Sequence, residues 1–175
     1  MKVNFQGAST CALCVGLLDV VLTLIILYPF GGQATALSYL FGLIKLVAFA
    51  GALWYYKKNY KGEGTFTYGA GIKVGLVIGL FYGIIMGALQ FCLFQFDNQL
   101  VARMTEELKK AVAQMQLPPE MANQMMDSMQ ISLSPITQGF GGFFNTIVFA
   151  LFASLVAMIF LKEKEDYNSA MNGIQ

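Results

Sequence analysis

Residues 74–96 read VGLVIGLFYGIIMGALQFCLFQF and contain no Asp, Glu, Lys or Arg. A charge at the centre of a membrane-spanning helix costs roughly 2.5–3.5 kcal/mol on insertion scales, so a long charge-free apolar stretch indicates a span. About 20 apolar residues are enough to cross a hydrocarbon core of about 30 Å. We therefore predict a membrane-spanning helix over about residues 68–94.

The composition of the whole chain is also typical of a membrane protein. Of its 175 residues, 57% are hydrophobic and 12% are charged, whereas soluble domains have roughly 25% charged residues. The formal net charge is +1, so no global field attracts nucleic acid. The sequence has no His, which is the commonest general base and the commonest metal ligand. We expect no enzymatic activity, no cofactor, no metal site and no nucleic-acid partner.

Two further stretches without charged residues, 20–44 and 128–161, contain the other predicted spans. The first is interrupted at 28–33 by YPFGGQ, where one Pro and two Gly predict a turn. Apolar sequence continues beyond the charges that flank this stretch, so we predict two spans joined by a tight hairpin. Together with the span described above, the predicted spans cover about residues 8–28, 36–56, 68–94 and 140–161.

The polar segment 97–135 separates the third and fourth predicted spans. Its apolar residues recur at three- and four-residue steps, which is the pattern of amphipathic helices. Pro118 and Pro119 separate two such helices, and Ser134 and Pro135 close the segment. We predict a helical hairpin whose apolar faces pack on each other or lie on the membrane surface. The two apolar stripes comprise Leu100, Val101, Met104, Leu108, Ala111, Val112 and Met115, and then Met121, Met125, Met129 and Leu133.

The predicted fold class is an all-α, four-transmembrane-helix bundle, a single domain over 1–175 with an extracytoplasmic amphipathic helical hairpin between the third and fourth helices. Basic residues are retained on the cytoplasmic side of a membrane. Three lysines at 57–61 connect the second and third spans, whereas segment 97–135 carries more acidic than basic residues. We therefore expect both termini to be cytoplasmic. A secretory signal peptide, suggested by Lys2 before an apolar run, is disfavoured because Asp19 interrupts that run.

Three features of the sequence resemble a known family. They are the run GTFTYG at residues 64–69 before a Gly-rich span, the outer insert with Met and acidic residues, and the run LKEK at residues 161–164 after the last span. The chain resembles, over nearly its whole length, the small bacterial inner-membrane proteins of the domain of unknown function 4199 (DUF4199) family. This resemblance implies a four-helix layout in a bacterial cytoplasmic membrane, with no established activity and no site residues.

Asp19 and Lys45 are charged residues inside the first two predicted spans. They lie at nearly equal distances from the predicted turn, and the helix from Asp19 to Pro29 is about 15 Å long, which places both charges near mid-membrane. Adjacent antiparallel helices could pair them, so that each offsets the burial cost of the other. The pair either fixes the register of the two helices or acts as a proton or ion site. We favour the structural role because no second acidic residue inside the spans extends a relay.

Glycine recurs at every fourth position along the third predicted span. Such a row leaves a groove on one helix face, where a neighbouring backbone approaches closely and gains van der Waals contact. We expect it to pack against another span of the same chain, and a homo-oligomer seam or a lipid groove is the alternative. The row comprises Gly71, Gly75, Gly79, Gly83 and Gly87, and its expected partners are Gly139, Gly141 and Gly142 at the head of the fourth span.

Cysteine and methionine suggest redox and metal chemistry, which we disfavour. Cys11 and Cys14 form a CxxC motif, but they lie inside a predicted span, where small polarizable packing residues are expected. Six methionines in the outer hairpin suggest thioether ligation of Cu(I). Without His, and at the spacing of a buried face, adaptable packing or partner binding is the better interpretation.

These features predict a non-enzymatic membrane scaffold or accessory protein. Its expected partners are the lipid bilayer and other membrane proteins, or a second copy in a homo-oligomer. The alternative is a small transporter or proton-linked permease that uses Asp19 and Lys45.

Overall fold

The computed structural model describes residues 3–30, 35–60, 65–115 and 118–163. Within these residues the chain forms helices and no strand, which confirms the all-α prediction. The predicted turn at 28–33 begins too early, because residues 28–30 still belong to the first helix, and its other residues lie outside the described residues. Residue 61 of the lysine cluster and residues 64 and 164 of the two quoted motifs also lie outside them. The helices are α1 (Phe5–Phe30), α2 (Thr35–Tyr60), α3 (Tyr68–Phe96), α4 (Asn98–Gln114), α5 (Pro119–Ser132) and α6 (Pro135–Leu161).

Four of these helices, α1, α2, α3 and α6, are long and apolar enough to span a membrane, which confirms the four predicted spans. The fourth span starts earlier than predicted, because Ser134 and Pro135 open α6 and do not simply close the outer segment. The Ser134 hydroxyl accepts a hydrogen bond from the backbone N–H of Thr137, which caps the helix. Pro135 fits the first turn, where a missing N–H leaves no helical bond unmade.

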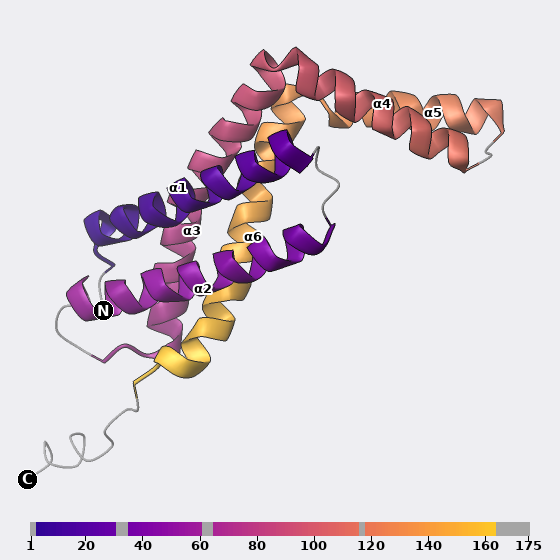
Figure 1. The fold of residues 1–175 in the computed structure, drawn as a ribbon. Coiled ribbons are helices and arrows are strands. Elements are labelled where there is room, and N and C mark those ends of the chain that lie inside the picture. The colour runs from indigo at the N-terminus through magenta and orange to yellow at the C-terminus, as the bar shows by residue number, and fades with distance from the viewer. Residues whose placement is uncertain (1–2, 31–34, 61–64, 116–117, 164–175) are drawn as a thin grey trace, which may run out of the picture.

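The spanning helices form two pairs, α1 with α2 and α3 with α6 (Figure 1). The pairs cross obliquely in this view, and contacts between α1 and α3 and between α2 and α6 join them. Buried apolar side chains from all four helices fill the core, among them Ala12, Phe49, Ile78 and Ala150. Helix α2 is the least buried span and α3 and α6 are the most buried. Much of the apolar surface therefore faces outward, as expected where lipid is the solvent.

Hydrogen bonds join the ends of the spans that lie nearest the two chain termini. Lys57 on α2 donates to the carbonyl of Leu161 at the end of α6, at 2.9 Å, and pairs with Glu163 at 3.4 Å. The backbone N–H of Phe66 donates to the Glu163 carboxylate at 2.8 Å, and the Glu163 N–H donates back to the Phe66 carbonyl at 3.1 Å. Lys57 thus satisfies a carbonyl that has no partner within its own helix. These bonds fix α2, the segment before α3 and the end of α6 to one another.

At the opposite end, Asp97 makes the corner between α3 and α4. Its backbone N–H donates to the carbonyl of Leu93, which finishes α3. One of its carboxylate oxygens caps α4 by accepting the backbone N–H of Leu100 at 2.9 Å. The other oxygen accepts the hydroxyl of Tyr28, near the end of α1, at 2.6 Å. The corner therefore ties three helices together.

Helices α4 and α5 lie side by side and project sideways from the α3/α6 pair (Figure 1). Near the root of the projection, the apolar stripe of α4 packs on the ends of α1 and α3 in a cluster around Phe94, Leu100 and Leu133. Farther out, Val112 is buried on α4, whereas α5 has no buried residue. The apolar contact between α4 and α5 therefore buries α4 side chains more fully than α5 side chains.

Candidate functional site

Asp19, near the middle of α1, lies at the centre of a polar cluster among the spans. Only 3% of its surface is exposed. One of its carboxylate oxygens forms an ion pair with the ammonium of Lys45, near the middle of α2. The structure therefore brings together the two charged residues that the equal-depth argument singled out. The Lys45 side chain is 24% exposed, compared with 5% for the side chain of Asp19.

Tyr82, at the midpoint of α3, is the third member of this cluster. Its hydroxyl donates a hydrogen bond to the second carboxylate oxygen of Asp19, and the residue is 1% exposed. Thr23, one turn farther along α1, donates to the first oxygen at 3.4 Å. The polar cluster, meaning Asp19, Thr23, Lys45 and Tyr82, thus joins three of the four spans.

Sequence analysis did not identify Tyr82 or Thr23 as members of this cluster. A signal for Tyr82 was present, because tyrosine in membrane proteins concentrates at the two interfaces. Tyr82 instead lies in the middle of a charge-free span, where its hydroxyl needs a buried partner. Thr23 gave no comparable signal, since a threonine in a helix can bond to its own backbone.

The polar cluster balances charge where water is scarce. Removing a carboxylate or an ammonium from water costs several kcal/mol, and an ion pair offsets this cost only when further hydrogen bonds complete it. Both oxygens of Asp19 are occupied, and in the described part of the chain no buried side-chain nitrogen or oxygen lacks a partner. The arrangement can fix α1, α2 and α3 in register. It also holds a carboxylate beside a phenol and an ammonium, which are groups that exchange protons.

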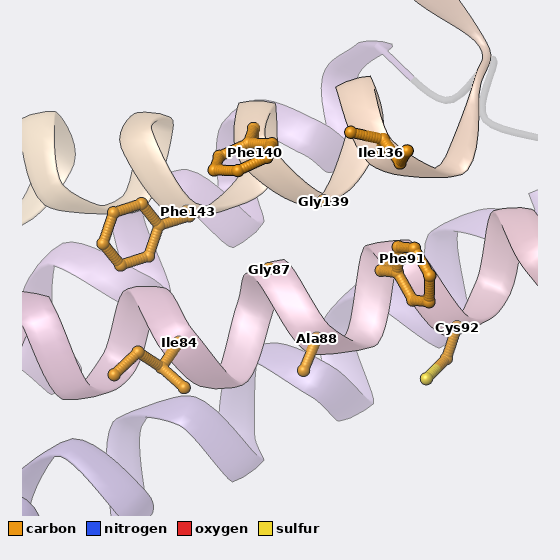
Figure 2. A pocket seen from close by; sticks show the side chains of 9 residues that line it. All are labelled: Ile84, Gly87, Ala88, Phe91, Cys92, Ile136, Gly139, Phe140 and Phe143. Carbon is orange, nitrogen blue, oxygen red and sulfur yellow. The ribbon is translucent and has the colours of Figure 1, made fainter.

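The glycine row of α3 faces α6. A Cβ added at Gly79 would lie 2.5 Å from Cβ of Ala150, and one added at Gly87 would lie 2.9 Å from the carbonyl oxygen of Gly139. Figure 2 shows Gly87 and Gly139 facing each other across the two helices. Only glycine leaves room for so close an approach. At the other three positions, the nearest atoms to such a Cβ belong to Met158 for Gly71, Ser154 for Gly75 and Phe143 for Gly83.

The three glycines at the head of α6 differ in their surroundings. Gly139 meets the backbone of Gly87, as expected. A Cβ at Gly142 would instead meet the side chain of Gln90, and one at Gly141 would meet nothing within 4 Å. The expectation that Gly141 packs against the row is therefore wrong, because this residue lies on another face of α6.

The three cysteines differ in their surroundings. Cys11 is buried, and its thiol donates to the carbonyl of Ala52 on α2 at 3.4 Å. Cys14 and Cys92 are exposed on the helix surfaces. No group of three or more His, Cys, Asp or Glu side chains suited to a metal ion occurs among the residues that the structure describes.

The sequence model of the family described as protein of unknown function (DUF4199) matches residues 10–163, which is most of the chain. No curated protein and no solved structure matches. The match confirms the resemblance inferred from the 64–69 run, the outer insert and the end of the last span. This chain is a member of the DUF4199 family.

Proposed function

We propose that this protein is a non-enzymatic scaffold or accessory protein of a bacterial cytoplasmic membrane. Its α4/α5 pair, on the extracytoplasmic side, contacts other membrane proteins. The observation that carries this proposal is the sideways projection of α4 and α5 from the spans (Figure 1). A projection that served only to connect α3 to α6 would not need two helices of this length.

Exposed apolar side chains on this projection support the proposal. Met115 is 53% exposed, Met121 is 58% exposed and Ile131 is 70% exposed. Exposed methionine suits a surface that adapts to a partner, because its side chain is flexible and polarizable. These three side chains are not buried in the contact between α4 and α5 and so remain accessible to a partner.

Photo-crosslinking in intact cells tests the proposal. A benzoylphenylalanine residue replaces Met121 in one variant and Ile131 in a second, while a third carries it at the exposed polar position Lys110. We expect a discrete crosslinked band from the first two variants and a weaker or absent band from the third. Identical bands from all three positions, or no band at either apolar position, would contradict the proposed contact surface.

The proposed topology rests on the distribution of lysine and arginine, and it is tested separately. A single cysteine is introduced at Ser128 or at Lys162 in a chain whose native cysteines are replaced by serine. An impermeant maleimide should label the Ser128 variant in intact cells and the Lys162 variant only after lysis. The reverse pattern would invert the topology and place α4 and α5 in the cytoplasm.

A second candidate function is proton-linked transport through the polar cluster. The observation that favours it is the position of a carboxylate at mid-span, beside a lysine that keeps 24% of its side chain exposed. In proteoliposomes, Asp19→Asn should abolish a proton-dependent flux while the protein still inserts and accumulates. A normal flux in this variant, or no flux in the unmodified protein across a panel of ions and small solutes, would reject transport.

A further inference from the structure

A groove lies between α3 and α6, near the end of the spans that carries α4 and α5 (Figure 2). Its volume is about 430 Å³, and ligand pockets typically have about 300–1,000 Å³. Its larger lining side chains are all aliphatic or aromatic. They are Ile84, Phe91, Ile136, Phe140 and Phe143. Its lining on α3 runs from Ile84 to Cys92, over which the helix rises about 12 Å. The groove therefore covers most of the depth of one leaflet, which is about 15 Å.

A polar pocket of about 680 Å³ adjoins this groove, and Cys92 lines both. It is more polar than the groove, because Tyr28, Asp97, Asn98 and Gln99 line it beside the apolar side chains of Leu89, Leu93 and Phe96. A smaller pocket shares Tyr28, Asp97 and Gln99 with it and adds Arg103. An apolar groove at membrane depth thus leads past Cys92 to a carboxylate, two amides and a guanidinium at the end of the spans. This order of groups, from apolar to polar, matches the layout of a lipid.

Asp97 supplies the negative charge of the polar pocket. The hydrogen bond from the Tyr28 hydroxyl, followed by the bond from the backbone N–H of Leu100, holds the pKa of this carboxyl below its ordinary value. Asp97 is therefore ionised at neutral pH. Each oxygen accepts one of these two bonds. The backbone N–H of Gln99 and the guanidinium of Arg103 also favour the charged form, and a carboxylate offers about four lone-pair sites. The carboxylate can accept a further N–H donor from a ligand.

We propose that this site binds a glycerophospholipid with an ethanolamine headgroup. One acyl chain lies in the α3/α6 groove, the ammonium donates to Asp97, and the phosphate faces Arg103, since guanidinium groups bind phosphate well. A choline headgroup carries the same charges but has no N–H to donate. A glycerol headgroup has no positive charge, and its phosphate would face Asp97 without an ammonium to balance it.

The proposed lipid would bind at the same end of the molecule as the proposed protein partner. In this placement alone, lipid binding rests on the proposed accessory function. The lipid test uses purified protein alone. Lipid retention can therefore be absent while crosslinking to a partner in cells succeeds, and crosslinking can fail while the purified protein still retains the lipid.

Native mass spectrometry of the purified full chain in detergent is the test. Dioleoyl lipids with ethanolamine, choline or glycerol headgroups are added in equal amounts, and the retained lipid is counted. We expect the ethanolamine lipid to be retained about tenfold over each of the others, a ratio that corresponds to 1.4 kcal/mol. Equal retention of the ethanolamine and choline lipids, or a preference for either other lipid, would overturn the proposal.

Two variants locate the bound lipid, each with a matched control. Asp97→Asn keeps the helix cap, because Asn is as good an N-cap as Asp, but removes the charge. It should abolish the tenfold preference, whereas Asp127→Asn on α5 should retain it. Ala88→Phe fills the groove from an exposed position of α3 and should reduce total retention, whereas Val148→Phe on an exposed face of α6 should not.

Far-ultraviolet circular dichroism and gel filtration check that each variant is folded. A folded Asp97→Asn protein that keeps the preference would reject the headgroup assignment. A folded Ala88→Phe protein that keeps full retention would reject the groove, as would a second copy of the chain occupying it in place of lipid.

Discussion

Replacing Gly79 with alanine should destabilise the protein, because the glycine row leaves no room for a Cβ between α3 and α6 at this position. The added Cβ would lie 2.5 Å from Cβ of Ala150, which is itself fully buried. Overpacking of this kind typically costs about 1–3 kcal/mol. Alanine also favours a helix over glycine by roughly 0.5–1 kcal/mol, so the clash must be separated from this gain.

Gly141→Ala provides the matched control. A Cβ at this position meets nothing within 4 Å, so only the helix preference acts and stability should stay level or rise slightly. The difference between the two variants isolates the clash at Gly79, and we expect it to be about 1–3 kcal/mol. The measurement is reversible unfolding in mixed micelles, with SDS as the denaturant and circular dichroism as the signal.

A compensating change makes this prediction sharper. Ala150→Gly removes the atom that the new Cβ would strike, so the double variant with Gly79→Ala should be more stable than the sum of the single effects by about 1–3 kcal/mol. If Gly79→Ala is as stable as Gly141→Ala, or if Ala150→Gly gives no relief, the row does not depend on this close approach and the reasoning is wrong.

Three further predictions concern the polar cluster and the corner made by Asp97. Asp19→Asn and Lys45→Gln should each destabilise the protein by about 3–5 kcal/mol, as expected for an uncompensated buried charge. In the same unfolding assay, the double variant should recover much of this loss. Additive losses would mean that the two charges do not stabilise each other. Tyr82→Phe should cost about 1.5–3 kcal/mol, since it removes a hydrogen bond to a charged group, and an unchanged unfolding midpoint would exclude that bond. The pKa of Asp97 lies below its ordinary value of 3.8, so the stability that Asp97 contributes is complete above pH 3.8 and is lost as the pH falls through the lower, folded-state pKa. Unfolding followed from roughly pH 5 to pH 2 should show a larger acid-dependent loss for the unmodified protein than for Asp97→Asn, and identical profiles would contradict this assignment.

The four spans could be predicted because charge is expensive in the bilayer, so the charge-free stretches and the turn signal at 28–33 mark them directly. The pairing of Asp19 with Lys45 could be predicted because the two residues lie at nearly equal distances from that turn. Helix start and stop signals were less reliable at the start of α6, because Ser134 and Pro135 are compatible both with the end of one helix and with the start of the next. The capping bond to Thr137 decides this case, and it is visible only in three dimensions.

The parts of the site that sequence analysis missed depend on how the two helix pairs meet. Tyr82 contacts Asp19 because α3 crosses α1 at mid-span. The sequence pattern of α3 does not predict which helix packs against the face that carries Tyr82. Gly141 was grouped with Gly139 because the two are close in sequence. Two residues along a helix correspond to a rotation of about 200°, so the pair cannot share a face.

The ion pair of the polar cluster also bears on the order in which the chain can assemble. Both charges lie within the first 60 residues, on consecutive helices, so they can neutralise each other before α3 has been synthesised. Helices α1 and α2 can then enter the bilayer with their two mid-span charges paired, which spares each of them the cost of carrying a lone charge into lipid. The Tyr82 hydroxyl can join this pair only after α3 has been synthesised, and the contact between α3 and α6 can form only after α6 has emerged from the ribosome.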